Sequence, residues 1–410
     1  MLASLLLVAF MLQLSAVVIL DLEQLTDFVG YMNMATSMLE TGHMQDGQGN
    51  VAFYSAGWPL FLVPFFALFG STMEVAQYVN VLLGTASVYL VHLCAKEILP
   101  NWKWAAFSTF IWVTYAPTIL YTEYIAKENL MVPLMLLQLL LVLRFSNSAN
   151  KTTSSILLGL IFGYQLIVGP ATILTGAIIG IIVLNFHLKN EFWKALQWRP
   201  AFIFLLVSFI TLVPWLVYTD SELGEPVLNT NGSFNLYIGN NPNAGPFFIN
   251  IDETPIGDGW HELKDAQGGE LGISKYLKKE ALNYIFENPG RTFILSVQKV
   301  VYFWMPPIHE GKEGNQSLLE TLVRVVWAIS YCIIMFFALI PLFFYRKLNR
   351  SHLILYGTAL LYCGIHAAAY VIFRYRLPIM PIMCILASQG LYYLYIWWLD
   401  KKDTGASEAA

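Results

Sequence analysis

The sequence predicts an all-α polytopic membrane protein, because of its composition and the spacing of its apolar runs. Hydrophobic residues make up 57% of the 410 residues, charged residues make up 12%, and the mean hydropathy is +0.57. A soluble globular protein carries roughly a quarter charged residues. Since a helix needs about 20 apolar residues to cross a bilayer, the runs predict about ten transmembrane helices, with outer juxtamembrane helices and one extracytoplasmic loop region.

The expected spans follow one another along the chain. The first, residues 2–20, lacks a preceding basic segment and a small-residue cleavage site, so we expect it to be retained. The others are expected at residues 75–94, 104–121, 129–143, 156–168, 171–186, 201–218, 322–344, 353–373 and 377–397. Gly169 and Pro170 separate the fifth span from the sixth, because proline breaks a helix.

Two further apolar stretches, residues 51–70 and 292–306, are expected to lie along the outer surface. With both uncrossed and the N-terminus in the cytoplasm, the basic loops fall on the cytoplasmic side, as membrane proteins prefer. Crossing by either stretch alone would reverse the basic loops that follow it. Pro59 and Pro64 in the first stretch and Lys299 in the second suit interfacial helices.

The spans and loops divide the chain into regions. Turn-forming pairs such as Asn231-Gly232 crowd a polar stretch, 219–291, which predicts a large outer loop. The expected regions are an N-terminal transmembrane module at 1–218 with a first outer loop at 21–74, an extracytoplasmic loop and interfacial helix at 219–318, C-terminal transmembrane helices at 319–400, and a cytoplasmic tail at 401–410.

The charge balance and the cysteines narrow the function classes. A net charge of -4 gives no sign of a nucleic-acid partner. The four cysteines lie in apolar runs, with neither a disulfide framework nor a metal-ligand spacing. No glycine-rich nucleotide motif and no nucleophile elbow is visible. We therefore name no cofactor: the residues do not indicate a divalent metal, although they leave a requirement for one open.

The first candidate for chemistry is Asp27, a carboxylate a short way past the first span. At the outer membrane face such a group can act as general base on an acceptor hydroxyl or amine. The alternative is an ordinary N-cap, because a helix is expected over residues 30–41. Asp21 and Glu23 are rivals for the same role.

The second candidate cluster, Glu123, Lys127 and Glu128, opens the fourth span. A glutamate in the first turn of a helix is stabilised by the helix dipole by about 0.3–1 kcal/mol, which offers a structural explanation for Glu128. No such explanation covers Lys127.

The third candidate cluster is Arg374, Tyr375 and Arg376 in the last outer turn, with His366 two turns earlier. The planar fork of arginine suits phosphate oxygens. The alternative is that these arginines reach outward to lipid headgroups. A lone histidine in a span is more often an interhelical hydrogen-bond donor than a catalyst.

The fourth candidate is the segment from Gly239 to Gly245, which contains Asn240 and Asn241. Amide side chains bind sugar hydroxyls, but glycine and asparagine also favour tight turns, and a turn alone is the simpler explanation.

Taken in order, these features resemble the GT-C superfamily of integral-membrane glycosyltransferases, and most closely the bacterial and archaeal relatives of protein O-mannosyltransferases and of the lipid A aminoarabinose transferase. The resemblance covers nearly the whole chain. Asp27-x-x-x-Tyr31 followed by Gly57-Trp-Pro is similar to the family's first outer loop, and residues 122–130 are similar to its second outer loop. Gly239-Asn-Asn-Pro with Gly245 is similar to a motif in the family's large loop. Arg374-Tyr-Arg-Leu-Pro-x-x-Pro381 is similar to the family's last outer turn.

The resemblance implies a GT-C-like fold and transfer of a sugar from a polyprenyl-phosphate donor, in one inverting step, with Asp27 as base and Glu128 assisting. Arg374 and Arg376 are implied to bind the donor phosphate, with Lys127 and Lys299 as further candidates. The expected substrate-binding residues are Tyr31, Tyr54, Asn240, Asn241, His366 and Tyr375. The expected partners are this donor, a lipid, glycan or protein acceptor, and membrane lipids, at the extracytoplasmic face of a prokaryotic plasma membrane.

Departures from the family pattern keep other classes open. Phe28 follows Asp27 where many relatives carry Asp-Glu, Gly169 stands where relatives often carry arginine before proline, and Tyr218 follows a Pro-Trp pair where many carry Arg-Asn. Two basic groups are thus missing, which leaves open a non-catalytic scaffold of the same fold. A lipid-linked sugar transporter or flippase is the third class, and the scarcity of ionisable residues inside the spans disfavours it.

Overall fold

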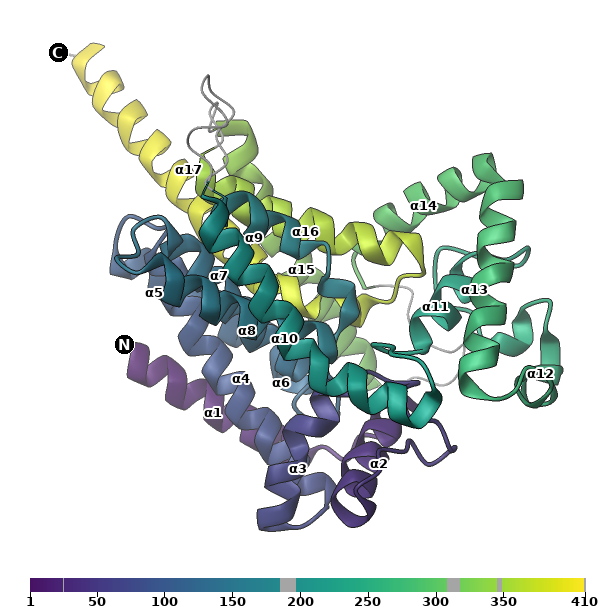
Figure 1. The fold of residues 1–410 in the computed structure, drawn as a ribbon. Helices are drawn as coiled ribbons and strands as arrows, with labels where there is room; N and C mark the ends of the chain where they lie inside the picture. The colour runs from purple at the N-terminus through teal and green to yellow at the C-terminus, as the bar shows by residue number, and fades with distance from the viewer. Residues whose placement is uncertain (25, 185–196, 308–317, 345–348, 409–410) are drawn as a thin grey trace.

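The computed structural model describes residues 1–410 except 25, 185–196, 308–317, 345–348 and 409–410. The described residues are almost entirely helices and connecting turns, and they contain no strand beyond one isolated bridge between Phe247 and Val371 (Figure 1). The all-α class expected from the sequence is therefore confirmed.

The helices have the following bounds. The longer ones are α1 (Leu2–Ile19), α4 (Met73–Lys96), α7 (Glu128–Phe145), α8 (Lys151–Val168), α10 (Trp198–Leu223), α13 (Glu270–Glu287), α15 (Leu318–Phe344), α16 (Arg350–Ala368) and α17 (Met380–Glu408). The shorter ones are α2 (Thr26–Thr41), α3 (Gly57–Phe69), α5 (Trp102–Thr114), α6 (Ala116–Leu120), α9 (Thr175–Val183), α11 (Asn231–Gly239), α12 (Trp260–Ala266) and α14 (Pro289–Trp304), with the 3-10 turns η1 (Pro170–Thr172), η2 (Ile251–Glu253), η3 (Gly257–Gly259) and η4 (Phe373–Ile379).

Seven helices in the described part of the chain are long and apolar enough to cross a membrane. They are Leu2–Ile19, Met73–Lys96, Glu128–Phe145, Lys151–Val168, Trp198–Leu223, Thr321–Phe343 and Phe373–Lys402. The chain is an integral membrane protein, as its composition predicts.

The other three expected spans lie on helices that fall short of this standard. Residues 104–121 are divided between α5 and α6 at Tyr115, because a proline two residues later cannot donate the N–H that would continue α5. Residues 171–186 begin as the turn η1 and continue as the 9-residue α9. Of residues 353–373, only 353–368 lie on α16, which carries buried polar groups such as His366 among its apolar residues, and the remainder leads into η4.

The two apolar stretches that we expect to lie along the surface form short helices. α3 has 13 residues and α14 has 16. Both are shorter than the roughly 20 residues of a typical span. Their lengths fit the juxtamembrane helices expected for this fold class.

Glycines let the long helices approach closely. A Cβ at Gly163 of α8 would lie 2.6 Å from the backbone oxygen of Ser208 in α10. A Cβ at Gly390 of α17 would lie 2.0 Å from the backbone oxygen of Phe337 in α15. Small residues at such crossings are how membrane helices gain van der Waals contact, since lipid supplies no hydrophobic drive between them.

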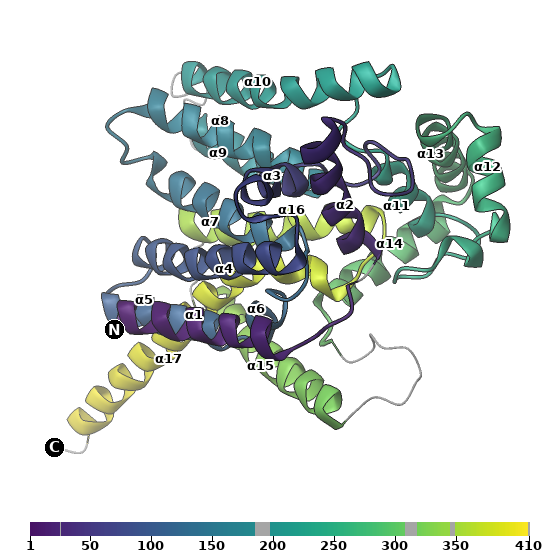
Figure 2. The ribbon, with the colours of Figure 1, turned by 90° about the horizontal axis from the view of Figure 1, so that it is seen from below.

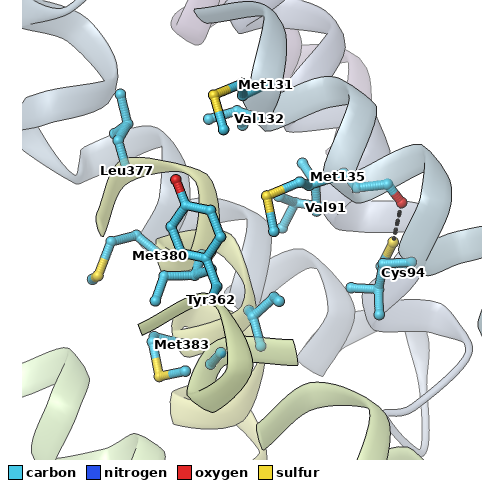
Figure 3. Packing of buried hydrophobic residues seen from close by; sticks show 14 of the residues in the cluster. Val91, Cys94, Met131, Val132, Met135, Tyr362, Leu377, Met380 and Met383 are labelled. Carbon is cyan, nitrogen blue, oxygen red and sulfur yellow. Dashed lines mark hydrogen bonds between the residues drawn. The ribbon is translucent and has the colours of Figure 1, made fainter. Parts of the chain in front are cut away.

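A methionine-rich core fills the space where α4, α7, α16 and α17 meet (Figure 3). Met131 and Met135 of α7 and Met383 of α17 are buried beside Tyr362 of α16. The Cys94 thiol donates to the carbonyl of Leu136 at 3.4 Å across the α4–α7 contact. Flexible thioethers suit such irregular junctions.

The loops gather at one end of the bundle. Figure 2 shows α2 and α11–α13 at one end of the long helices, with the start of α1 and the end of α17 at the other. We call the end formed by α2 and α11–α13 the loop end. α11 packs on α13, and η4 contacts α7, α16 and α17. The first, second and third candidate clusters, on α2, at the start of α7 and on η4, therefore meet at the loop end.

Candidate active site

An ion pair between Asp27 and Arg374 forms the centre of the candidate site. Asp27 lies in the first turn of α2, and Arg374 lies in η4, which joins α16 to α17. Nη1 of Arg374 donates to Oδ1 of Asp27 at 3.3 Å, and Nη2 donates to Oδ2 in a closer contact. The two side chains are 16% and 18% exposed for Arg374 and Asp27 respectively. This is the bidentate geometry in which arginine binds carboxylates and phosphates most strongly.

Glu128 flanks the same guanidinium. It is the first residue of α7 and is 2% exposed. Its Oε1 lies 3.8 Å from Nε of Arg374, and Nε has no hydrogen-bond partner among the described residues. Arg374 thus lies between two carboxylates, and its charge compensates the burial of both.

Lys127 supplies a second cation beside this group. Its ammonium makes no hydrogen bond within the described part of the chain. Burial lowers the pKa of Lys127, with Arg374 acting in the same direction and the neighbouring Glu128 and Asp27 in the opposite one. A half-buried amine without a hydrogen-bonded partner is available to an incoming anion.

Aromatic side chains line the group. The Phe28 ring centroid lies 5.0 Å from the Arg374 guanidinium carbon. Tyr31 packs on Tyr54 at 5.5 Å between ring centroids. Burial raises the pKa of both hydroxyls, and the Asp27 charge adds to that effect. Both phenols therefore stay protonated and can donate hydrogen bonds.

The ring of His366, in α16, stacks on the ring of Tyr375, in η4. Their ring centroids are 4.4 Å apart, and the Tyr375 hydroxyl donates to the hydroxyl of Tyr370 at 2.8 Å. Nε2 of His366 is buried and has no hydrogen-bond partner among the described residues. An unpaired buried nitrogen costs about 1–3 kcal/mol, so this atom is a candidate for a ligand contact.

Arg376 and Lys299, both expected at the donor phosphate, have protein partners at helix ends. Nη1 of Arg376 donates to the carbonyls of Phe303, at 3.2 Å, and of Met305, where α14 ends. Nζ of Lys299 donates at 2.8 Å to the carbonyl of Gly239, where α11 ends. Arg376 and Lys299 are 1% and 0% exposed. Their role at a phosphate stays a prediction, and their contacts favour a structural one.

Asn240 and Asn241 are similarly engaged. The Asn240 amide donates to the carbonyls of Leu236 and Ala368, both at 2.8 Å. The Asn241 amide donates to the carbonyls of Tyr237, at 2.9 Å, and Ile238, at 3.1 Å. Both side chains are 1% exposed. These contacts match the simpler turn explanation, and sugar binding by these residues stays an untested prediction.

Amide side chains that carry no motif hold the loop before Lys127. Asn80 of α4 donates to the carbonyls of Thr122, at 3.0 Å, and Tyr124, at 2.8 Å. Gln24 donates to the carbonyl of Glu123 at 3.0 Å. Isolated amides of this kind give no sequence signal, which is why sequence reasoning missed them.

One departure from the family pattern has a local explanation. A Cβ at Gly169 would lie 2.8 Å from Sδ of Met131, so a larger side chain there requires Met131 to move. At the second departure, the Tyr218 hydroxyl accepts the backbone N–H of Met44 at 2.7 Å.

No metal cluster is present in the described ranges: no three His, Cys, Asp or Glu side chains come together there. The positive charge near the carboxylates of Asp27 and Glu128 is the guanidinium of Arg374, which is paired with both.

The sequence matches no protein-family model and no curated protein. The structure is similar to that of ArnT from Cupriavidus metallidurans bound to undecaprenyl phosphate, with a TM-score of 0.57 and 12% identity over 95% of this chain and 59% of that one. It is also similar to the archaeal oligosaccharyltransferase AglB from Archaeoglobus fulgidus in complex with an inhibitory peptide and a dolichol-phosphate, with a TM-score of 0.57 and 12% identity over 99% of this chain and 52% of that one.

Both structures are GT-C glycosyltransferases, so the GT-C fold expected from the sequence is confirmed. The chain spans little more than half the length of each. At this level of identity the likeness concerns the fold, and the activity has to be argued from the site.

Proposed function

We propose that this protein transfers a sugar from a polyprenyl-phosphate donor to an acceptor at the extracytoplasmic face of a prokaryotic plasma membrane. The observation that carries the proposal is the position of Arg374 between Asp27 and Glu128, with Lys127 beside them. Undecaprenyl phosphate and dolichol-phosphate in the two similar structures support the donor class.

Lys127 and Arg374 are the groups we assign to the donor phosphate. Nε of Arg374 has no hydrogen-bond partner within the described residues, and the half-buried Lys127 lies beside the same group. A phosphate that meets both cations gains charge-assisted hydrogen bonds in a site shielded from water, where they are strong. As Arg374 turns toward the phosphate, its two hydrogen bonds to Asp27 weaken.

Asp27 is then free to act as the base. Its carboxylate removes the proton from the acceptor hydroxyl or amine, and the acceptor atom bonds to the anomeric carbon of the sugar. The bond from that carbon to the phosphate oxygen breaks, and the polyprenyl phosphate leaves with the electron pair. One base on one face implies inversion at the anomeric carbon. Glu128 assists by holding Arg374 in register.

The test is transfer from a radiolabelled polyprenyl-phosphate sugar into lipid, glycan or protein fractions, with the full chain in membrane vesicles. Asp27→Asn should abolish transfer, and Lys127→Gln should lower it by on the order of 10²–10³, the usual effect of losing one charge contact in the transition state. Lys279→Gln, at an exposed lysine of α13, is the matched control.

The two variants must still insert into the membrane and remain folded at the assay temperature, as shown by a cooperative unfolding transition above it. Near-normal turnover by folded Asp27→Asn overturns the assignment of the base. Absence of transfer by the parent protein, together with binding of the labelled donor, favours the non-catalytic scaffold instead.

A further inference from the structure

A small polar cavity lies at the loop end, next to the candidate active site. Its volume is about 100 Å³. Gln48, Asn50 and Phe53, from the segment after α2, form one side, and Trp260 and Lys264 of α12 form the other. Since one water needs roughly 10–15 Å³ by a comparable measure, the cavity has room for several waters or for one small ring.

The side of the cavity nearest α2 is held rigidly. The Asp46 carboxylate accepts the backbone N–H of Gln48 at 2.8 Å and of Asn50 at 3.0 Å, and the Asn50 amide at 2.7 Å. A rigid wall of this kind limits the entropy lost when a ligand binds.

Glu270 ties this segment to the large loop. At the start of α13, its carboxylate accepts the backbone N–H groups of Val51, at 2.7 Å, and Ala52, at 3.0 Å, and the hydroxyl of Thr230 at 2.8 Å. Glu270 is 8% exposed and also lines the cavity. The two sides of the cavity therefore keep a fixed separation.

The cavity combines an aromatic wall with hydrogen-bonding groups. Trp260 packs edge-on against Phe234 at 5.4 Å, and Phe234 packs in the same way against Phe53 at 5.6 Å. The Lys264 ammonium donates to Oδ1 of Asn50 at 2.5 Å at the rim. A sugar ring presents the complementary features: C–H groups on one face for the aromatic wall, and hydroxyls at its edge for amide and charged groups.

The charges disfavour other small ligands. A carboxylate, Glu270, and an ammonium, Lys264, both line the cavity, so neither an anion nor a cation meets a uniform field there. The polar side chains disfavour a prenyl chain, which would leave them unsatisfied.

The position of the cavity distinguishes donor from acceptor. Phe53 lines the cavity, and the next residue, Tyr54, packs on Tyr31 of α2. Tyr54 lies within electrostatic reach of both Asp46, beside the cavity, and Asp27, in the site. The Phe53-Tyr54 pair thus lies between the cavity and the cations that we assign to the donor phosphate. The donor sugar is covalently bound to that phosphate, so the cavity is left for the acceptor.

We propose that this cavity binds a sugar unit of the acceptor, so that the acceptor is a glycan or a glycoconjugate. The inference rests on the proposed transfer reaction, and it names the chemical class of the acceptor in that reaction. Trp260 supplies the stacking face, and Lys264 and Gln48 supply hydrogen bonds to hydroxyls.

Saturation-transfer NMR on the full chain in nanodiscs tests binding without any need for transfer. The probes are the methyl glycosides of glucose, galactose, mannose and N-acetylglucosamine at millimolar concentration. We expect at least one to give a signal that falls at least fivefold in Trp260→Leu and in Lys264→Gln, and that is unchanged in Lys279→Gln. The inference is wrong if none of the four glycosides gives a signal, or if the signal is the same in all three variants.

Failure of the inference and failure of the transfer reaction are distinguishable. Glycoside binding by a parent protein that transfers no sugar supports the cavity and contradicts the transfer proposal. Transfer by Trp260→Leu and Lys264→Gln with the parent KM for acceptor overturns the cavity alone. If both proposals hold, these two variants raise the acceptor KM at least tenfold and leave kcat within twofold of the parent.

Discussion

Arg374 donates two hydrogen bonds to Asp27 across 347 positions of sequence, and this contact joins the first helix of the loop end to the last turn of the bundle. The pair is mostly buried, with Glu128 on its other side. Neither segment presents a complete site alone, so the candidate site exists only once η4 has packed against α2 and α7. Folding and site assembly are therefore coupled.

The Asp27–Arg374 pair should show strong energetic coupling. Asp27→Asn and Arg374→Gln each leave a partly buried charge without its partner, whereas the double variant removes both charges. We expect the double variant to be more stable than the sum of the single losses predicts, with a coupling free energy of about 1–3 kcal/mol. Thermal unfolding in detergent measures it, and simple additivity contradicts a direct interaction.

Arg376 should behave differently from Arg374, although the two are neighbours in one motif. Its guanidinium donates to carbonyls at the end of α14 and lies 4.2 Å from the Tyr331 ring centroid. Arg376→Gln should destabilise the fold by about 1–3 kcal/mol, the usual cost of unpaired buried acceptors. Turnover per folded molecule should fall far less than in Arg374→Gln. A large loss of turnover at an unchanged melting temperature would instead restore Arg376 to the donor phosphate.

Lys299 should give the protein a recognisable pH dependence. Burial lowers the pKa of its ammonium to about 8, from 10.5 for an exposed lysine. Between these two values the unfolded chain binds more protons at this residue than the folded chain does, so this residue makes stability rise with pH. Below pH 8 both states are protonated and the cost of burial is fully present.

The comparison that isolates this effect is with Lys299→Met, which cannot titrate. The parent protein should gain stability relative to Lys299→Met as the pH is raised from 7 to 10, as measured by unfolding temperature. Lys279→Met, at an exposed lysine of α13, should show no such trend. A constant difference between the parent and Lys299→Met would mean that Lys299 is charged throughout.

The sequence was informative about fold class and about the residues that meet at the loop end. Apolar runs predict helices at their own positions, because the length needed to cross a membrane is a local property. Asp27, Glu128 and Arg374 could be grouped because their segments are all expected at one membrane face. Phe28 departs from the family pattern, and its ring packs on Arg374.

Sequence reasoning could not separate ligand-binding groups from groups that bond helix ends. Arg376, Lys299 and Asn240 have the chemistry of phosphate or sugar ligands, and their partners here are backbone carbonyls. Which carbonyls are left without a helical partner depends on where each helix ends in three dimensions. The break of one expected span at Tyr115 has a different cause, because the proline two residues later acts locally.

The last prediction concerns the two glycines that bracket the asparagine turn. Gly239 ends α11, where a Cβ would lie 1.8 Å from the backbone oxygen of Ala369, just before η4. No side chain can be accommodated there unless α11 moves away from the turn that carries Arg374. Gly239→Ala should therefore cost at least about 1–3 kcal/mol, the usual price of overpacking, and should lower transfer as well.

Gly245 is the matched control, because a Cβ there would meet nothing within 4 Å and its φ is not positive. Gly245→Ala should change the unfolding temperature little and leave transfer intact. The two variants add the same methyl group a few residues apart in one turn, so a difference between them measures the contact between α11 and the segment before η4. If Gly239→Ala keeps the unfolding temperature and the transfer rate of Gly245→Ala, this contact neither stabilises the protein nor positions Arg374.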